Sequence, residues 1–437
     1  MTPTQSPAKI GLWTTTSLVI GNMIAAGVFL LPASLASFGG IGLLGWVGSS
    51  LGAIALAILF SHLSKLIPNA TGGPYAFTRT GLGDFAAFLV AWGYWISIWS
   101  TNAAIAVTFV SYSTVFFPVL ATNSFLSVAT GLSAVWILTW INTLGIKEAG
   151  LVQTVTTILK LIPLLLVSFV GLFYIHIENF SPFNISGTSN FAAITATTTL
   201  TLFAFLGLES ATIPSGNIHE PEKTIPRATM IGTIITILVY VLGSAVVMGM
   251  IPAHELRVSN APFSDAAALI WGDGARDWVA AGAIASTLGA LNGWILLQGQ
   301  MPMAAARDNL FPVIFKYENK KGTPAVGFVV GSILISALMT MNFTKGLTET
   351  FTFMVLLTTV AVAVPYLFSA AAYGVILLQN KFWRRDSMSK IILAVVTFVF
   401  SLWAIIGSGE VTVYWGFIAI LSGIPFYVWM KRGNQNT

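Results

Sequence analysis

Long apolar runs separated by short polar segments are the dominant pattern of this chain. An α-helix needs about 20 predominantly apolar residues to cross the hydrocarbon core of a bilayer. By this criterion the sequence predicts twelve transmembrane helices, at roughly 11–34, 40–66, 84–116, 126–144, 149–175, 192–213, 228–251, 277–304, 324–343, 348–378, 391–408 and 412–430. We therefore expect an all-α membrane protein in which residues 1–437 form one transmembrane domain in a lipid bilayer.

The composition strengthens this prediction. Hydrophobic residues make up 56% of the chain and charged residues 8%, whereas soluble domains carry about 25% charged residues. The first apolar run extends from Ile10 to about Pro32 and has no small-residue cleavage site after it. It is too long for a signal-peptide core, so we expect it to remain as the first span. The chain contains no cysteine, which excludes a disulfide framework, a thiolate metal site and a cysteine nucleophile. No cofactor and no metal site is predicted.

The placement of lysine and arginine predicts the orientation. With the N-terminus in the cytoplasm, sixteen of the twenty basic residues fall on the inner side, and three (Arg257, Arg276 and Lys345) fall on the outer side. Cytoplasmic loops are enriched in basic residues, so both termini are predicted to be cytoplasmic. The basic residues are scattered in short loops, so the net charge of +5 indicates no nucleic-acid partner. The lack of a long extracellular domain fits a bacterial inner membrane.

Two glycine-containing segments interrupt runs that are otherwise suited to continuous helices. They are Gly-Asn-Met-Ile-Ala-Ala-Gly at 21–27 and Phe-Leu-Gly-Leu-Glu-Ser at 205–210. A helix broken at membrane depth must line a protein-walled or watery cavity, and paired breaks point to the midplane site of a secondary transporter. Exposed amides suit a carboxylate and exposed carbonyls suit an ammonium, so an amino acid fits both. The alternative is that these glycines serve only close helix packing.

Two ionisable residues lie far from the ends of their predicted spans. Lys160 is near the middle of the fifth span, and Glu209 is in the second break. A charge near the bilayer centre costs at least ~2.5–3.5 kcal/mol on insertion scales, so both are candidates for functional roles. The alternative is a structural charge paired with backbone carbonyls.

Aromatic and amide side chains recur on two predicted spans. Trp92, Trp95, Trp99 and Asn102 share one stripe of the third span, and the eighth contains Asn292-Gly293-Trp294. Such aromatics could surround a cation or only pack against neighbours. Asn102 could bind a ligand or join two helices. Spacing does not choose between these interpretations.

Five motifs make the chain similar to a known family. They are Gly-Asn-Met-Ile-Ala-Ala-Gly-Val-Phe-Leu-Leu-Pro at 21–32, Gly-Gly-Pro-Tyr-Ala at 72–76, Phe-Leu-Gly-Leu-Glu-Ser-Ala at 205–211, Pro-Glu-Lys-Thr-Ile-Pro-Arg-Ala at 221–228 and Leu-Phe-Pro-Val-Ile-Phe at 310–315. Over essentially its whole length the chain resembles the amino acid–polyamine–organocation superfamily. Within it, the bacterial basic amino acid/polyamine antiporters, such as the arginine/agmatine exchangers, look closest.

The resemblance implies a leucine-transporter-like fold and a set of site residues. Residues 11–175 and 192–378 would be inverted repeats with broken helices 1 and 6, and 391–430 would hold two accessory helices. The implied substrate-binding residues are those of the main-chain cradle and of the side-chain wall, namely Asn22, Met23, Ala26, Gly27, Phe203, Leu206, Ile98, Asn102, Trp294 and Thr358. The carboxylate would meet the amides around Ala26 and Gly27, and the ammonium would meet carbonyls of Met23, Phe203 and Leu206. The family's gating residues are matched by Tyr94, Glu209 and Tyr366. A family tyrosine that is linked to the pH response is matched by Tyr75.

Three positions depart from the family's pattern. Ala26 stands where the family has a serine, which removes a hydroxyl donor to the carboxylate. Phe203 stands where the arginine/agmatine exchanger has a tryptophan, so the ring is kept and the N–H is lost. Lys160 stands where the polyamine exchangers look apolar, and it resembles the lysine of proton-coupled and neutral amino-acid members. A buried lysine can lose its proton near neutral pH, which makes Lys160 the candidate for proton coupling.

These features together predict a secondary amino-acid transporter that works by alternating access. Exchange of a cationic amino acid for its amine or another amino acid is favoured by the motifs and Glu209, while Lys160 favours proton-coupled transport of a neutral amino acid. A homodimer is left open.

A polytopic membrane enzyme is a remote alternative. His-Glu at 219–220 and at 254–255 lacks a second histidine four residues later, and no Gly-x-Ser-x-Gly occurs. A channel would need rings of charge or a repeated filter sequence, and the sequence has neither.

Overall fold

Helices make up nearly all the regular structure of the computed structural model, which describes residues 10–67, 72–145, 161–213, 215–342, 345–379 and 387–433. No strand occurs within these ranges, and an isolated parallel bridge joins Ile10 to Ile218. Lys160 and the first part of the predicted fifth span lie outside the described residues. The chain is thus all-α in its described part, as predicted.

The helices follow the predicted spans in order. The first half contains α1 Leu12–Met23, α2 Gly27–Ala36, α3 Gly42–Leu66, α4 Pro74–Ser113, α5 Val119–Thr122, α6 Ser124–Thr143 and a shorter apolar helix, Leu161–Tyr174. The second half contains α8 Asn190–Leu202, α9 Pro221–Met250, α10 Ala253–Leu256, α11 Pro262–Trp271, α12 Asp273–Arg307, α13 Ala325–Met341, α14 Leu347–Gln379, α15 Ser387–Gly407, α16 Glu410–Leu421 and α17 Ile424–Gly433. Short 3₁₀ turns are η1 Leu172–Tyr174, η2 Ile177–Phe180, η3 Phe203–Phe205, η4 Ser210–Thr212, η5 Ser215–Asn217 and η6 Val313–Lys316.

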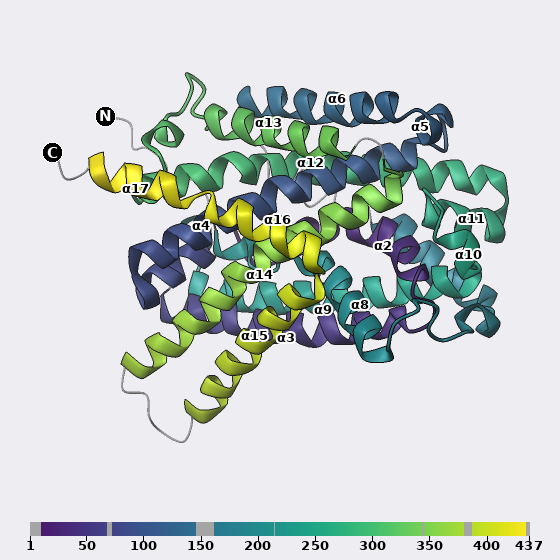
Figure 1. Cartoon of the computed structure of the whole chain (residues 1–437), viewed down its shortest axis with the longest axis horizontal. Helices are drawn as coiled ribbons and strands as arrows, with labels where there is room; N and C mark the ends of the chain where they lie inside the picture. The colour runs from purple at the N-terminus through teal and green to yellow at the C-terminus, as the bar shows by residue number, and fades with distance from the viewer. Residues whose placement is uncertain are drawn as a thin grey trace.

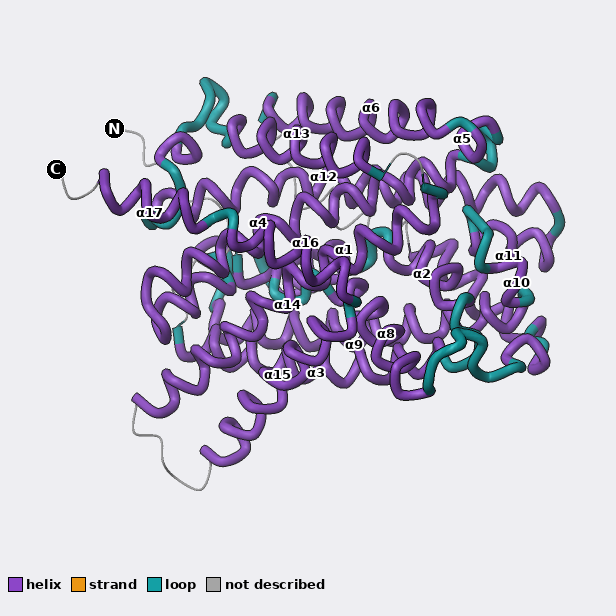
Figure 2. Tube along the Cα trace, viewed as in Figure 1, coloured by secondary structure: helices purple, strands orange, loops and turns teal. Residues whose placement is uncertain are grey.

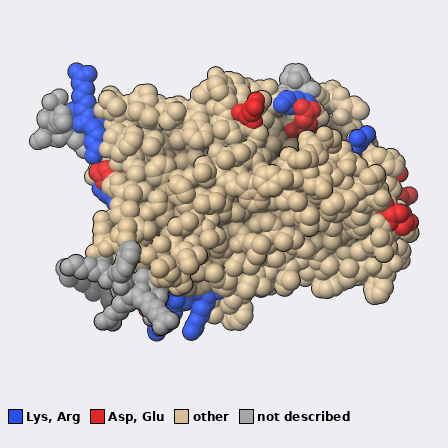
Figure 3. All heavy atoms as spheres, turned by 60° about the horizontal axis from the view of Figure 1, so that its bottom comes forward, with Lys and Arg blue, Asp and Glu red and all other residues tan. Residues whose placement is uncertain are grey.

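Ten helical segments in the described part are long and apolar enough to cross a membrane. The helices Leu161–Tyr174 and Ala325–Met341, at the predicted fifth and ninth spans, are shorter. A multi-pass membrane protein is therefore confirmed at this coarser level. Figure 3 shows one face of the molecule that is largely free of charged side chains, as lipid contact requires.

Proline and glycine explain where helix ends differ from the predicted boundaries. α4 begins at Pro74 rather than near residue 84, and the chain kinks at Gly83, whose φ of 81° is left-handed. α9 begins at Pro221, seven residues before its predicted start, because proline is well accommodated at the first helical position. The predicted span at 412–430 is divided into α16 and α17, and Gly423, which lies between them, is so close to the Trp92 ring that a Cβ there would clash.

The long helices pack side by side in one bundle. α4 makes its most extensive contacts with α14 and α12, and α3 lies against α8 and α9. Small residues allow this close approach: a Cβ on Gly45 of α3 would lie 2.6 Å from the Thr197 backbone, and Thr201 Oγ1 donates to the Gly45 carbonyl over 2.9 Å. α17, the last described helix, lies at one end of the bundle (Figure 1), and the loops beside α10 lie at the opposite end (Figure 2).

Candidate functional site

The first predicted break separates α1 from α2. α1 ends at Met23, Ile24 leaves the helical region with a ψ of 84°, and α2 begins at Gly27. The amides of residues 26–28 lie at the N-terminus of α2, where no acceptor within the helix is available and the helix dipole favours negative charge. The Met23 carbonyl accepts the Ala25 amide (2.9 Å) and the Tyr240 hydroxyl. This break therefore offers free amides, while one of its carbonyls is already engaged.

The second predicted break follows α8. The chain passes from α8 into η3, turns at Leu206 and Gly207, and re-forms a single 3₁₀ turn at η4. Gly207 has a φ of 94°, a region that only glycine adopts without strain. Both interruptions predicted from the sequence are thus confirmed.

The two breaks pack directly against each other. A Cβ placed on Gly27 would lie 3.1 Å from Ala204 Cβ, and one placed on Gly207 would lie 3.1 Å from Asn22 Cβ. Trp294 of α12 completes the contact, because its Nε1 donates to the Asn22 carbonyl over 3.1 Å. Only residues without a bulky side chain allow this approach, which gives Gly27 a packing role in addition to any role in binding.

Glu209 joins the second break to two long helices. Its side chain is fully buried, with Oε1 accepting from the Tyr94 hydroxyl of α4 (2.6 Å) and Oε2 from the Tyr366 hydroxyl of α14 (2.7 Å). The residues that the sequence grouped as gating candidates therefore form one hydrogen-bonded unit. Neither carboxylate oxygen has a cationic partner among the described residues.

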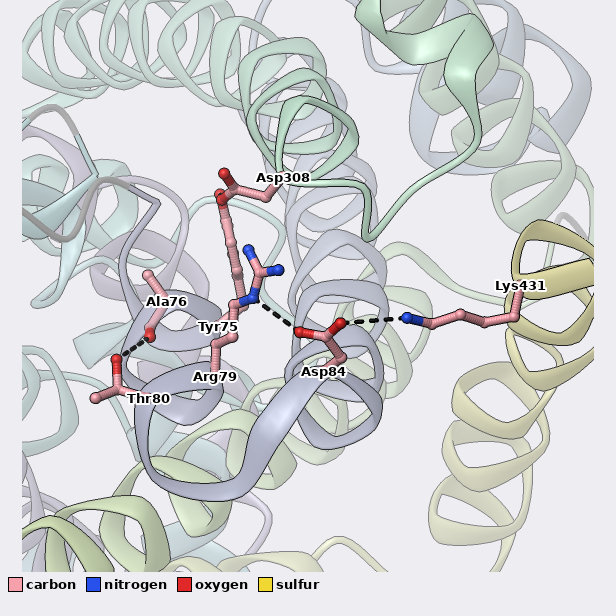
Figure 4. Close-up of polar contacts among 7 residues, drawn as sticks. All are labelled: Tyr75, Ala76, Arg79, Thr80, Asp84, Asp308 and Lys431. Carbon is pink, nitrogen blue, oxygen red and sulfur yellow. Dashed lines mark hydrogen bonds and ion pairs between the residues drawn. The ribbon is translucent and has the colours of Figure 1, made fainter. Parts of the chain in front are cut away.

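Tyr75, grouped with them by the sequence, makes a different contact. Its hydroxyl donates to Asp308 Oδ2 over 2.9 Å, which ties the start of α4 to the end of α12. Figure 4 shows it beside the ion pairs of Asp84 with Arg79 (2.9 Å) and with Lys431 (3.2 Å). This contact lies near the ion pair that joins α4 to α17.

The predicted side-chain wall is formed by α4, α12 and α14. Asn102 Nδ2 donates to Gln298 Oε1 (2.8 Å), and Thr358 Oγ1 donates to Ser100 Oγ (2.8 Å). Gln298 was not among the residues singled out from the sequence. Its position one helical turn after Trp294, on the same face of α12, was the signal that could have identified it.

All ten candidate substrate-binding residues are buried, and Ile98, Asn102 and Thr358 expose no surface. A cavity of about 530 Å³ between α2, α8 and α14 is lined in part by Ser34, Leu200 and Thr352, and none of the ten candidate residues lines it. Ser34 Oγ and Thr352 Oγ1 are hydrogen-bonded at 2.9 Å. The candidate site is therefore enclosed in this structure.

Trp92 and Trp95 belong to an aromatic cluster, and Trp95 Nε1 also donates to the Gln298 carbonyl over 3.1 Å. Trp92 lies against Phe311 and Phe426, with ring centroids 5.5 and 5.2 Å away. Trp95 contacts Phe315 at 5.5 Å. For these two tryptophans the packing interpretation is the better one.

Comparisons with known proteins show the family of the chain. The model of the amino acid permease family matches residues 10–428. The chain is 32% identical to a cadaverine/lysine antiporter of Escherichia coli K12, over 99% of this chain and 97% of the relative. It is 31% identical to an arginine/ornithine antiporter of Pseudomonas aeruginosa (93% and 87%), and 28% identical to the putrescine transporter PotE of Haemophilus influenzae (96% of each).

These matches cover nearly the whole chain and include both breaks, so the protein is a membrane transporter and not an enzyme. The chain belongs to the amino acid permease family and, within it, to the basic amino acid/polyamine antiporters.

Proposed function

We propose that this protein exchanges a cationic amino acid for its amine, or for another amino acid, by alternating access. The observation that carries the proposal is the direct packing of two unwound segments. The first lies beside free main-chain amides, and the second is hydrogen-bonded to α4 and α14 through the buried Glu209 carboxylate. Broken helices at membrane depth are the binding elements of secondary transporters. The relatives named as antiporters for lysine, arginine, ornithine, cadaverine and putrescine support the substrate class.

The substrate carboxylate binds the amides at Ala26 and Gly27, next to Asn22. Its α-ammonium binds the carbonyls of Phe203 and Leu206. Met23 can contribute its carbonyl only by sharing it with Tyr240, because that oxygen already accepts two hydrogen bonds. The substrate side chain lies among Ile98, Asn102, Trp294 and Thr358, which are all buried.

Glu209, Tyr94 and Tyr366 form the inner gate in this proposal. Their hydrogen bonds hold the second break against α4 and α14, so they must separate when the site opens. Tyr75 adds a second closure through Asp308 and takes the family's pH-linked role.

Twelve spans follow if the shorter helices Leu161–Tyr174 and Ala325–Met341 also cross the membrane. Residues 11–175 and 192–378 then form the inverted repeats of a leucine-transporter-like fold, with 391–430 accessory. The bias of basic residues supports cytoplasmic termini, and the bacterial relatives support an inner-membrane location.

Proton-coupled transport of a neutral amino acid is the second candidate. It is favoured by the absence of an unpaired carboxylate among the described residues of the site, since both oxygens of Glu209 are occupied by tyrosines. Lys160 would then carry the coupling proton, and Lys160→Ala should flatten the pH dependence of transport. An unchanged pH profile in that variant would assign Lys160 a structural role. A homodimer also remains a proposal, to be tested by mass measurement in detergent.

Counterflow in proteoliposomes tests the proposal. Vesicles preloaded with lysine, arginine or ornithine should accumulate the labelled amino acid, and cadaverine, putrescine or agmatine on the opposite side should drive the exchange. Uptake that needs a proton gradient and accepts only neutral amino acids would overturn cationic exchange in favour of the second candidate.

A further inference from the structure

Asn102 leaves one half of its buried side-chain amide without a partner. Nδ2 donates to Gln298 Oε1 over 2.8 Å, whereas Oδ1 is buried and meets no donor. Buried polar atoms in native structures are nearly always paired. An unpaired acceptor at this depth therefore points to a donor that arrives with a ligand.

Gln298 can hold its own amide in only one orientation. Its Nε2 donates to the Phe328 carbonyl over 2.9 Å and to Ser332 Oγ over 3.2 Å. A main-chain carbonyl can only accept. Turning the Gln298 amide over would place its oxygen against that carbonyl, so Oε1 must face α4.

The orientation of Gln298 decides which end of Asn102 is left over. Because Oε1 cannot donate, Asn102 must present its NH₂ group to Gln298. Its oxygen is consequently the free end. Without Gln298, the Asn102 side-chain amide could rotate by about 180° and pair with a substrate acceptor as well as with a substrate donor.

Asn102 belongs to the candidate substrate site, and Gln298 lies next to it. Gln298 is one turn after Trp294 on α12, and Asn102 is one turn after Ile98 on α4, so each shares a helix face with a predicted wall residue. Trp294 in turn donates to the Asn22 carbonyl at the first break.

We propose that Gln298 is a positioning residue that sets substrate specificity. By fixing Asn102 with Oδ1 toward the substrate side chain, it makes the site select a terminal N–H donor (an ammonium or guanidinium group) over an apolar side chain of similar length. This inference rests on the proposed function, because it specifies what that site prefers.

The test compares lysine with norleucine, which lacks only the terminal nitrogen of the lysine side chain. Gln298→Met keeps the length of the side chain and removes both hydrogen-bonding ends. We expect the ratio of lysine to norleucine affinity, measured by binding and by KM in counterflow, to fall by about tenfold. Gln300→Met is the matched control, since Gln300 is exposed on the same helix, and should leave the ratio unchanged. Gln298→Leu replaces Gln298→Met if the latter does not assemble.

A double variant shows whether Gln298 acts through Asn102. Asn102→Leu should also lower the ratio, and Gln298→Met added to it should lower the ratio no further. A variant that weakens lysine and norleucine by the same factor, or two losses that add, would overturn the inference while leaving the proposed function intact. A wild-type protein that binds norleucine as well as lysine would instead overturn the proposed function.

Discussion

The two interrupted helices differ in what fills the gap. The break between α1 and α2 contains only aliphatic residues, Ile24, Ala25 and Ala26, and its polar groups are those of the main chain. The break after α8 carries Glu209, which is hydrogen-bonded to Tyr94 and Tyr366 on two other helices. At the first break, side chains of Trp294 and Tyr240 bond only to carbonyls and leave the amides of residues 26–28 available. The second break is held through its own carboxylate.

This difference indicates a division of roles. A ligand can use the first break without displacing any side-chain contact, because the amides of residues 26–28 have no acceptor within their helix. The second break cannot move without separating a carboxylate from two hydroxyl donors. Substitutions at the two breaks should therefore affect transport in different ways.

Removing the carboxylate of the second break should have the largest effect. Glu209→Ala leaves two buried tyrosine hydroxyls without their acceptor, at a cost of about 1–3 kcal/mol each, so we expect initial counterflow rates to fall by about 100-fold. Glu220→Ala is the control, because Glu220 is a surface residue paired with Lys223 and such pairs contribute little. Equal rates in the two variants would contradict a gate at Glu209.

Adding a methyl group where the breaks meet should have the next largest effect. In Gly27→Ala the new Cβ would lie 3.1 Å from Ala204 Cβ and 3.2 Å from its Cα, which pushes the two breaks apart, and we expect substrate affinity to fall by about tenfold. Gly282→Ala, where the Cβ would lie 3.3 Å from Pro163 Cγ away from both breaks, should keep wild-type affinity. A similar loss of affinity in both variants would mean that the methyl group acts by disturbing helix packing in general and not by separating the two breaks.

Two tryptophan substitutions form a matched pair and should have a smaller effect on substrate affinity. Trp294→Phe removes the Nε1 donor to the Asn22 carbonyl (3.1 Å), and Trp92→Phe removes an equivalent donor to the Ala419 carbonyl (3.0 Å). The loss is about 1 kcal/mol in each case. Only Trp294→Phe should raise the substrate Kd, by about fivefold, in a binding assay. Parallel changes in Kd would mean that Trp294 serves packing alone.

The smallest effect is expected at the second inner closure. Tyr75→Phe removes one hydrogen bond to Asp308 and should increase access to the site from the inner side by about threefold. The chain has no cysteine, so Ser210→Cys provides a single labelling site in the second break, and its reaction with an impermeant maleimide in inside-out vesicles measures access. Tyr373→Phe, which removes the contact of that hydroxyl with His62 (2.8 Å), is the comparison. Labelling that is no faster than in wild type would exclude a gating role for Tyr75.

The sequence predicted the breaks because glycine and a charge stand out within apolar runs. Gly207 and Glu209 are visible for this reason, whereas the contact of Glu209 with Tyr94 and Tyr366 was found only in the structure. Gln298 was missed because it carries no charge, so it did not stand out in its span as Glu209 did. Its importance depends on which way two amides face, and only the contacts with Phe328 and Asn102 decide that.

Some helix ends and the roles of the aromatic side chains also could not be predicted from the sequence. Gly423, between α16 and α17, lies against the Trp92 ring, a contact between residues more than 300 positions apart. The same cluster explains why Trp92 and Trp95 pack with phenylalanines rather than face a substrate. Such outcomes depend on tertiary neighbours that periodicity does not encode.

An experimental structure of the protein with bound lysine would test the division of roles most directly. The substrate carboxylate should lie about 2.9 Å from one or more amide nitrogens of residues 26–28, with the Glu209 carboxylate still held by tyrosines. Lysine bound elsewhere, or with its carboxylate paired to a basic side chain such as Arg257 in the cavity between α2, α8 and α14, would contradict binding by the unwound main chain.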